Sequence, residues 1–392
     1  MTRPLHLAVA LDGAGWHPAA WRQVTARPEK LFTARYWAGL VAEAERGLLD
    51  FVSIEDSLAL QTSLPDAVDD RSDQVRGRFD AVLLAARLAP LTRNIGLVPT
   101  ATTTHTEPFH VAIGIATLDH VSGGRAGWRP RVSARRAEAA NFGRREVPEL
   151  DPAAPDGELL AELFEEAADA VEAARRLWDS WEDDAEIRDA ATGRFIDRGK
   201  VHYTDFTGRG FSVRGPSITP RPPQGQPVVT VLDHGSSAVP YELPARSADV
   251  VHVTPRDRDH AAAIVRQVRA APRVGEPLKV FADLVVFLGG DAAARKARLD
   301  ELDGSEFTSD AAVFTGTPEE LADLLLDWRA AGIDGYRLRP GSLPYDLKAV
   351  TRGLTPALRR RGAFRGAYEA GTLRGLLGLP RSENRYAGAV TA

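Results

Sequence analysis

Cysteine is absent from the 392 residues of this chain, and methionine occurs once. Without cysteine the chain has no disulfides, thiolate nucleophiles or thiolate metal ligands, which excludes several classes of enzyme. No apolar run reaches the ~18 residues that suggest a membrane span. The first apolar segment is a short strand broken by Asp12, not a signal peptide. We therefore expect a cytoplasmic protein without a membrane partner.

An excess of positive charge is also missing. The formal net charge is −5, which argues against a surface that binds nucleic acid. Apolar residues make up 44% and charged residues 26% of the chain, as in an ordinary globular protein.

Short apolar segments alternate with helical patterns along most of the chain. The helical pattern 34–47 ends at Gly47, and the pattern 317–332 opens with a capping box of Thr317 and Glu320. Alternating strands and helices form parallel βαβ units, so we predict an α/β protein with a (β/α)8 TIM-barrel fold. The expected strands are residues 5–11, 50–56, 95–102, 226–232, 248–255, 278–287 and 334–340, with a shorter one at 125–128.

Two segments depart from this rhythm within what we expect to be a single domain, residues 1–392. Residues 184–226 are rich in Gly, Pro and Thr and predict an insertion with a small hairpin. Residues 351–392 form a C-terminal extension with too many basic and glycine positions for a buried helix. We expect this tail to wrap the barrel or a partner subunit.

In a TIM barrel the chemistry lies at the C-terminal ends of the strands. Polar residues are expected there at His17, Asp56, Thr102 to His105, Arg129, Ser236 and Ser237. A metal site is not expected. His105, His110 and His120 lack the spacing of a metal motif, and neutral histidines packed in a helix explain His110 and His120 better.

The segment "GSSAVPYEL", residues 235–243, follows a strand and enters a helix. Backbone N–H groups and two hydroxyls there could hold a phosphate. A plain helix N-cap at Ser237 explains the same residues equally well, and both interpretations stay open. A serine hydrolase is not indicated, because no GxSxG motif is present.

Several longer segments, taken together, carry a family resemblance. They include "GAGWHPAAWR" (13–22), "IGLVPTATTTHTEPFHVAIGIATLDHVSGGRAGW" (95–128) and "GTPEELADLLLDWRAAGIDGYRL" (316–338). With other matches along almost the whole chain, they resemble the bacterial-luciferase-like flavin monooxygenases. The most similar branch contains the nitrilotriacetate, EDTA, dibenzothiophene-sulfone and long-chain-alkane monooxygenases.

The resemblance implies a flavin across the C-terminal mouth of the barrel. It places Asp56 and Thr102 near the isoalloxazine ring and Ser236 and Ser237 at the phosphate. His17 falls near the substrate, as the residue closest to acid/base work. Reduced FMN would come from a separate NAD(P)H:flavin reductase and would react with O2 to oxidise a small organic substrate. Homodimers and homotetramers are common among such proteins.

The chain departs from the family pattern at the expected flavin site. Arg129 replaces an Asn, and Leu160 and Phe164 replace a His and a Tyr that help to hold the phosphate. Two extra residues add Asp233 and His234 beside the phosphate loop. Arg129 or His234 could replace the lost contacts, flavin could bind only transiently, or the chain could bind none.

Our leading hypothesis is an FMN-dependent monooxygenase. A flavin or deazaflavin oxidoreductase that transfers hydride without O2 is one alternative. A non-catalytic barrel that serves as a partner subunit or ligand binder is another.

Overall fold

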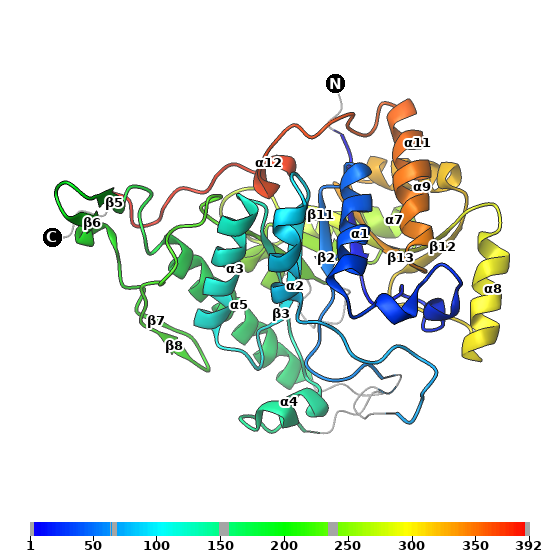
Figure 1. Cartoon of the computed structure of the whole chain (residues 1–392), viewed down its shortest axis with the longest axis horizontal. Coiled ribbons are helices and arrows are strands. Elements are labelled where there is room, and N and C mark those ends of the chain that lie inside the picture. Colours follow the sequence, from blue (N-terminus) through cyan, green and yellow to red (C-terminus); the bar gives the residue numbers. More distant parts are fainter. Residues whose placement is uncertain (1–3, 63, 65–68, 149–156, 234–241, 389–392) are drawn as a thin grey trace.

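The computed structural model describes residues 4–62, 64, 69–148, 157–233 and 242–388. Eight parallel strands pair in the order β10-β9-β4-β3-β2-β1-β13-β11, and pairing between β10 and β11 closes the barrel (Figure 1). The predicted (β/α)8 barrel is thus confirmed. Its strands are β1 (His6–Leu11), β2 (Phe51–Ile54), β3 (Gly96–Thr102), β4 (Gly127–Arg131), β9 (Val228–Leu232), β10 (Val250–Val253), β11 (Lys279–Leu288) and β13 (Gly335–Pro340).

Each predicted strand corresponds to one of these eight, although β4 begins two residues later than expected. A further strand, β12 (Ala312–Gly316), was not predicted and pairs with the C-terminal half of β11. The barrel strands are buried along nearly their whole length, which explains why their sequences are continuous apolar runs.

Helices cover the outside of the barrel (Figure 1). The predicted capping box is present, since the Thr317 hydroxyl accepts the Glu320 N–H and the Glu320 carboxylate accepts the Thr317 N–H. The main helices are α1 (Ala34–Arg46), α2 (Ala81–Leu88), α3 (Pro108–Ser122), α4 (Arg136–Phe142), α5 (Gly157–Asp179), α6 (Glu242–Ser247), α7 (Arg258–Ala270), α8 (Ala292–Asp303), α9 (Pro318–Ala330) and α10 (Tyr345–Ala349).

The segment 184–226 contains two short antiparallel hairpins. One pairs β5 (Glu186–Asp189) with β6 (Arg194–Ile196), and the other pairs β7 (Phe206–Thr207) with β8 (Ser212–Val213). Figure 1 shows both hairpins on the same side of the molecule, away from α8 and α9.

The C-terminal tail corrects one of our expectations. Its helices are α11 (Thr355–Arg360) and α12 (Leu373–Leu376), joined to α10 by a π-helical turn at Val350–Leu354. Although the tail is basic and rich in glycine, Leu373 and Arg374 of α12 are buried. Leu373 and Leu377 pack among apolar residues in the first half of the strands, where Gly96 and Gly127 leave room for the Leu373 side chain. The tail therefore fills the end of the barrel opposite the expected site.

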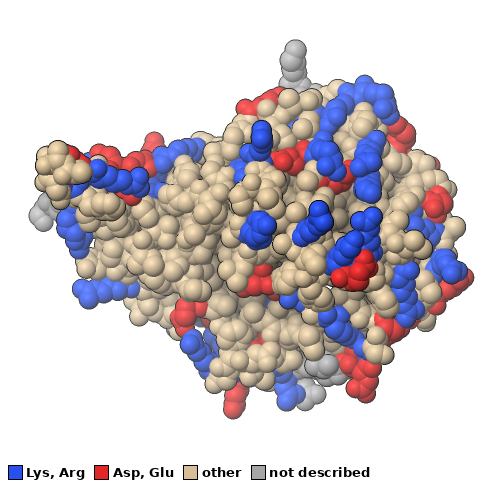
Figure 2. All heavy atoms as spheres, in the orientation of Figure 1, with Lys and Arg blue, Asp and Glu red and all other residues tan. Residues whose placement is uncertain are grey.

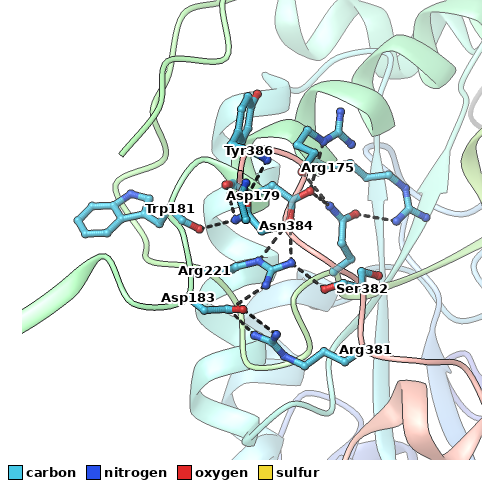
Figure 3. A network of polar contacts seen from close by, with 12 residues as sticks. Arg175, Asp179, Trp181, Asp183, Arg221, Arg381, Ser382, Asn384 and Tyr386 are labelled. Atoms are coloured by element: carbon cyan, nitrogen blue, oxygen red, sulfur yellow. Dashed lines mark hydrogen bonds and ion pairs between the residues drawn. The ribbon is translucent and has the colours of Figure 1, made fainter. Parts of the chain in front are cut away.

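A polar network ties the end of the tail to the C-terminus of α5 (Figure 3). Asn384 donates to the backbone oxygens of Asp179 and Trp181, each at 2.8 Å. The Asp179 carboxylate accepts from Arg221 at 3.1 Å. Arg381 pairs with Asp183, the residue directly before the predicted insertion. Because these charges are matched, the basic residues of the tail can lie against the protein without an unpaired buried charge.

Candidate functional site

The C-terminal mouth of the barrel contains a cavity of about 360 Å³, which we call the central cavity. Its volume lies within the range of small-molecule sites, ~300–1,000 Å³. One wall, from β9 and α5, is apolar, and the floor and the opposite wall are strongly charged. The lining residues are Trp16, Glu55, Arg129 to Val132, Phe164, Ala167, Val171, Val231, Leu232, Asp310, Arg337 and Arg339.

Glu55 lies at the centre of the charged floor. Its carboxylate pairs with Arg129 through one oxygen and accepts from Arg337 Nη1 through the other, at 3.0 Å. Glu55 directly follows β2, while Arg129 and Arg337 lie within β4 and β13, so the closed barrel brings them together. Burial alone would raise the pKa of Glu55, but the two guanidinium groups outweigh it and hold this pKa below its usual value.

Asp283 links Arg337 to a third arginine, Arg339. It accepts from Arg337 Nε at 2.9 Å and from Arg339 Nε at 3.0 Å. Arg339 also reaches Asp310 at 2.7 Å and lies 4.6 Å over the Trp16 ring, a cation–π geometry. Three arginines and three carboxylates thus form one balanced network in the barrel mouth.

Sequence analysis singled out Arg129 but missed Glu55, Arg337 and Arg339. A signal was present in "DGYRLRP", because two arginines at alternate positions of a buried strand project to the same face. In a closed barrel that face is the interior. Arg129 is 3% exposed, and burial lowers its pKa to about 10, against the opposing effect of Glu55.

Thr102 belongs to a neighbouring network at the ends of β3 and β4. Its hydroxyl accepts from Arg131 Nη1 at 3.4 Å, and Arg131 makes a two-point contact to Glu138 at 2.7 and 2.8 Å. Ser57 donates to the same carboxylate at 3.0 Å. Burial would raise the pKa of Glu138, but Arg131 dominates and lowers it to about 2. Thr102 is therefore held beside a fixed ion pair.

Asp56 connects the end of β2 to the start of α2. One carboxylate oxygen accepts the Ser57 N–H at 2.7 Å, and the other accepts the Ala81 N–H at 2.8 Å. Burial raises the pKa of Asp56, which these backbone hydrogen bonds only partly oppose. The side chain fixes the loop that follows β2, next to Ser57 and the Thr102 network.

His17 is fully enclosed and does not line the central cavity. Its Nδ1 accepts the Ala19 N–H at 3.1 Å, so Nε2 carries the proton and donates to Asp300 at 3.0 Å. Its ring packs against Phe307 at 5.1 Å. Burial lowers the pKa of His17 despite the Asp300 contact, which favours a neutral ring of fixed tautomer.

The predicted phosphate-loop residues His234, Ser236 and Ser237 lie outside the described residues. The two α5 positions where the family has phosphate partners are described. Phe164 lines the central cavity, so α5 presents an aromatic ring rather than a hydroxyl to it.

The histidines of α3 are not packed as expected. His110 and His120 are exposed on the outer face of this helix, where His120 reaches the Pro220 backbone oxygen at 3.2 Å. Both histidines face solvent, although most of their neighbours in the sequence are apolar and suggested a packed helix. His105 is buried and stacks on Phe142 at 5.4 Å. Within the described ranges, no three His, Asp or Glu residues are arranged to hold a metal ion.

The central cavity has the chemistry to hold a flavin ring. Trp16 Nε1 and Arg129 Nε, on two of its lining residues, are buried donors with no hydrogen-bond partner in the described chain. A buried donor without an acceptor costs ~1–3 kcal/mol, so a ligand with acceptors along one edge is favoured. A flavin has carbonyl oxygens and ring nitrogens on one edge and flat apolar faces, which match the wall formed by Val171, Val231 and Leu232.

Among the described residues, no helix is both long and apolar enough to span a membrane.

Comparisons with known proteins identify the family and agree with the barrel fold. The sequence profile of the luciferase-like monooxygenases matches residues 14–308. N-acetyl-S-(2-succino)cysteine monooxygenase of Bacillus subtilis (strain 168) is 32% identical, over 98% of this chain and 99% of its own. Nitrilotriacetate monooxygenase component A of Aminobacter aminovorans is 31% identical, over 98% of both chains. Riboflavin lyase with modified FMN has the same fold, with a TM-score of 0.82 and 23% identity over the full length of both chains.

Proposed function

The chain belongs to the luciferase-like monooxygenase family, and from that premise we propose that it is an FMN-dependent monooxygenase. It would take reduced FMN from a separate NAD(P)H:flavin reductase and use O2 to oxidise a small organic substrate. The observation that carries this proposal is the central cavity, which combines two buried donors that have no partner among the described residues with an apolar wall. One relative is named "component A", which supports a system in which a separate protein reduces the flavin.

Each part of the cavity would have its own task with the flavin bound. Trp16 Nε1 and Arg129 Nε would donate to the acceptor edge of the ring. Glu138 holds Arg131 in place, and Arg131 and Thr102 would contact the adjacent side of the flavin ring. The apolar residues of α5 and β9 would exclude water, which strengthens the polar contacts inside. The flavin itself supplies the reducing equivalents and the site at which O2 is activated.

His17 remains our predicted acid/base residue. Burial lowers its pKa, its Nδ1 accepts a backbone N–H so that Nε2 faces Asp300, and it lines a second cavity beside Trp16. Any proton transfer by His17 would therefore run along the Nε2–Asp300 hydrogen bond.

One observation favours the non-catalytic alternative. The Glu55–Arg129 pair occupies the floor of the mouth, and Arg129 replaces the Asn expected from the family pattern. If this pair keeps the ring out, the chain would act as a partner subunit or ligand binder. Hydride transfer without O2 stays the other alternative on the same barrel.

A titration distinguishes these functions. The purified chain is titrated with oxidised FMN and, without oxygen, with reduced FMN, while flavin fluorescence is followed. We expect micromolar binding of reduced FMN and fast oxidation of the bound flavin when O2 is admitted. Slow oxidation would favour hydride transfer, and no binding of either form would favour the partner subunit. Ser237→Ala should weaken binding, whereas the exposed control Ser305→Ala should not.

A further inference from the structure

A second cavity of about 270 Å³ lies at the C-terminal end of β1, and we call it the β1 cavity. Trp16 lines both this cavity and the central cavity, so the two are neighbours. The β1 cavity is lined by residues 12–18, by Gln61 and Thr62, and by residues 74–76. The residues from 61–62 and 74–76 flank a loop on the far side of the cavity from β1.

Most polar groups around the β1 cavity are already engaged within the protein. Arg76 binds the Gln61 backbone oxygen and the Asp69 carboxylate. The Gln61 side chain donates to the Gly77 oxygen at 3.0 Å and accepts the Gly77 N–H at 2.8 Å. The cationic group and the amide at this rim therefore hold the loop in place and offer little to a ligand.

Apart from Trp16, whose Nε1 has no partner among the described residues, most other polar side chains here show the same engagement. Both ring nitrogens of His17 are bonded, to Ala19 and Asp300. Gln74 donates to Asp303 at 3.1 Å, and Thr62 donates to Asp69 at 3.0 Å.

Asp12 is different. No group in the described part of the chain hydrogen-bonds its carboxylate, and the nearest cation, Arg78, lies 3.8 Å from Oδ1, beyond hydrogen-bond distance. The Asp12 side chain keeps 30% of its surface exposed, and it lines the β1 cavity. Burial raises the pKa of Asp12, and the nearby Glu55 adds to this, while Arg78 opposes it. A poorly solvated carboxylate with unsatisfied acceptors gains from a donor that carries positive charge.

We infer that the β1 cavity binds the substrate and that Asp12 recognises a protonated amine on it. This assignment rests on the proposed function, because it places the substrate beside the cavity assigned to the flavin. A carboxylate group would be disfavoured in the same position, because it would face Asp12 while Arg76 is already paired with Asp69. The site thus selects for a positively charged group.

Three probes of similar shape test this inference without knowledge of the natural substrate. Benzylamine, benzyl alcohol and benzoate are titrated into the flavin-free chain by calorimetry. We expect benzylamine to bind at least about tenfold more tightly than benzoate, with benzyl alcohol between them, since a charged hydrogen bond contributes about one to two powers of ten in affinity. Equal or tighter binding of benzoate would overturn the assignment.

Variants then test Asp12 itself. Asp12→Asn should weaken benzylamine about tenfold and leave FMN affinity unchanged. Asp12→Glu should keep the preference for the amine. If the Asn variant folds poorly, loss of this preference in a folded Asp12→Glu variant would count against the inference. The matched control is Asp70→Asn, an exposed carboxylate on the loop between residues 62 and 74. Unchanged benzylamine binding by a folded Asp12→Asn variant would contradict our inference.

The two proposals can fail separately. A chain that prefers benzylamine but binds no FMN would refute the monooxygenase and keep the β1 cavity as an amine site. A chain that binds FMN without this preference would refute the amine site alone.

Discussion

At the scale of single residues, Arg129 illustrates how a side chain depends on its partners. It is almost fully buried, and Glu55 replaces part of the water that its guanidinium group has lost. A buried ion pair adds little net stability over an apolar pair, but removal of one partner leaves a costly buried charge. Glu55 and Arg129 should therefore tolerate joint replacement better than single replacement.

Arg129→Asn should lower the free energy of unfolding by about 3 kcal/mol, because Glu55 loses one of its two cationic partners while it stays buried. Glu55→Ala should be costly for the complementary reason. In urea denaturation, the double variant Glu55→Ala/Arg129→Asn should be less destabilised than the sum of the two single variants. Additive losses would show that the pair is not coupled.

At the scale of secondary-structure elements, α12 is a short helix with a large structural role. Its Leu373 packs with Phe51 and Phe281 at the end of the barrel opposite the central cavity. The tail reaches this position because Gly124 O accepts the Leu373 N–H at 3.0 Å and Gln224 accepts the Arg374 N–H at 2.8 Å. A helix of four residues owes its stability to such contacts and not to its own helix propensity.

Leu373→Ala should lower the free energy of unfolding by about 2–4 kcal/mol, because the surrounding strands are too rigid to fill the space. The matched control is Val274→Ala, whose side chain is 99% exposed and should change stability by less than about 0.5 kcal/mol. Urea denaturation measures both. A small loss at Leu373 would mean that the tail packs loosely in solution.

At the scale of the whole molecule, charged side chains are unevenly spread. Figure 2 shows a broad area over α3 and α5 with few charges, while Lys and Arg gather over α1, α9 and α11. The exposed side chains Leu83 on α2 and Val121 on α3 lie on the outer layer of helices. Single exposed apolar side chains are common, but a surface with few charges around them is suited to a protein–protein contact.

We predict that the chain forms a homodimer or homotetramer that covers the outer face of α2 and α3. Leu83→Glu should then reduce the mass measured by sedimentation, because it would bury an unpaired carboxylate in the contact. Val274→Glu, at an even more exposed position in the loop between α7 and β11, should leave the mass unchanged. A wild-type chain that sediments as a monomer would contradict the prediction.

The barrel could be predicted because its signals are local. Buried parallel strands require continuous apolar runs, and Thr317 and Glu320 form a capping box within four residues. The buried position of α12 could not be predicted, since the partners of its basic residues lie far away in the sequence. Arg374, for example, pairs with Asp249, 125 residues earlier.

The sequence by itself determined the family, the alternation of strands and helices, and the strand ends that carry polar residues. Only the tertiary structure decided which of those side chains meet. Glu55 contacts Arg129 across 74 positions and Arg337 across 282 positions, and His17 turns away to Asp300. The reason is physical, because closure of the barrel sets these distances. Burial then decides which charges must be paired, and within the described residues Asp12 is a carboxylate that no donor reaches within hydrogen-bond distance.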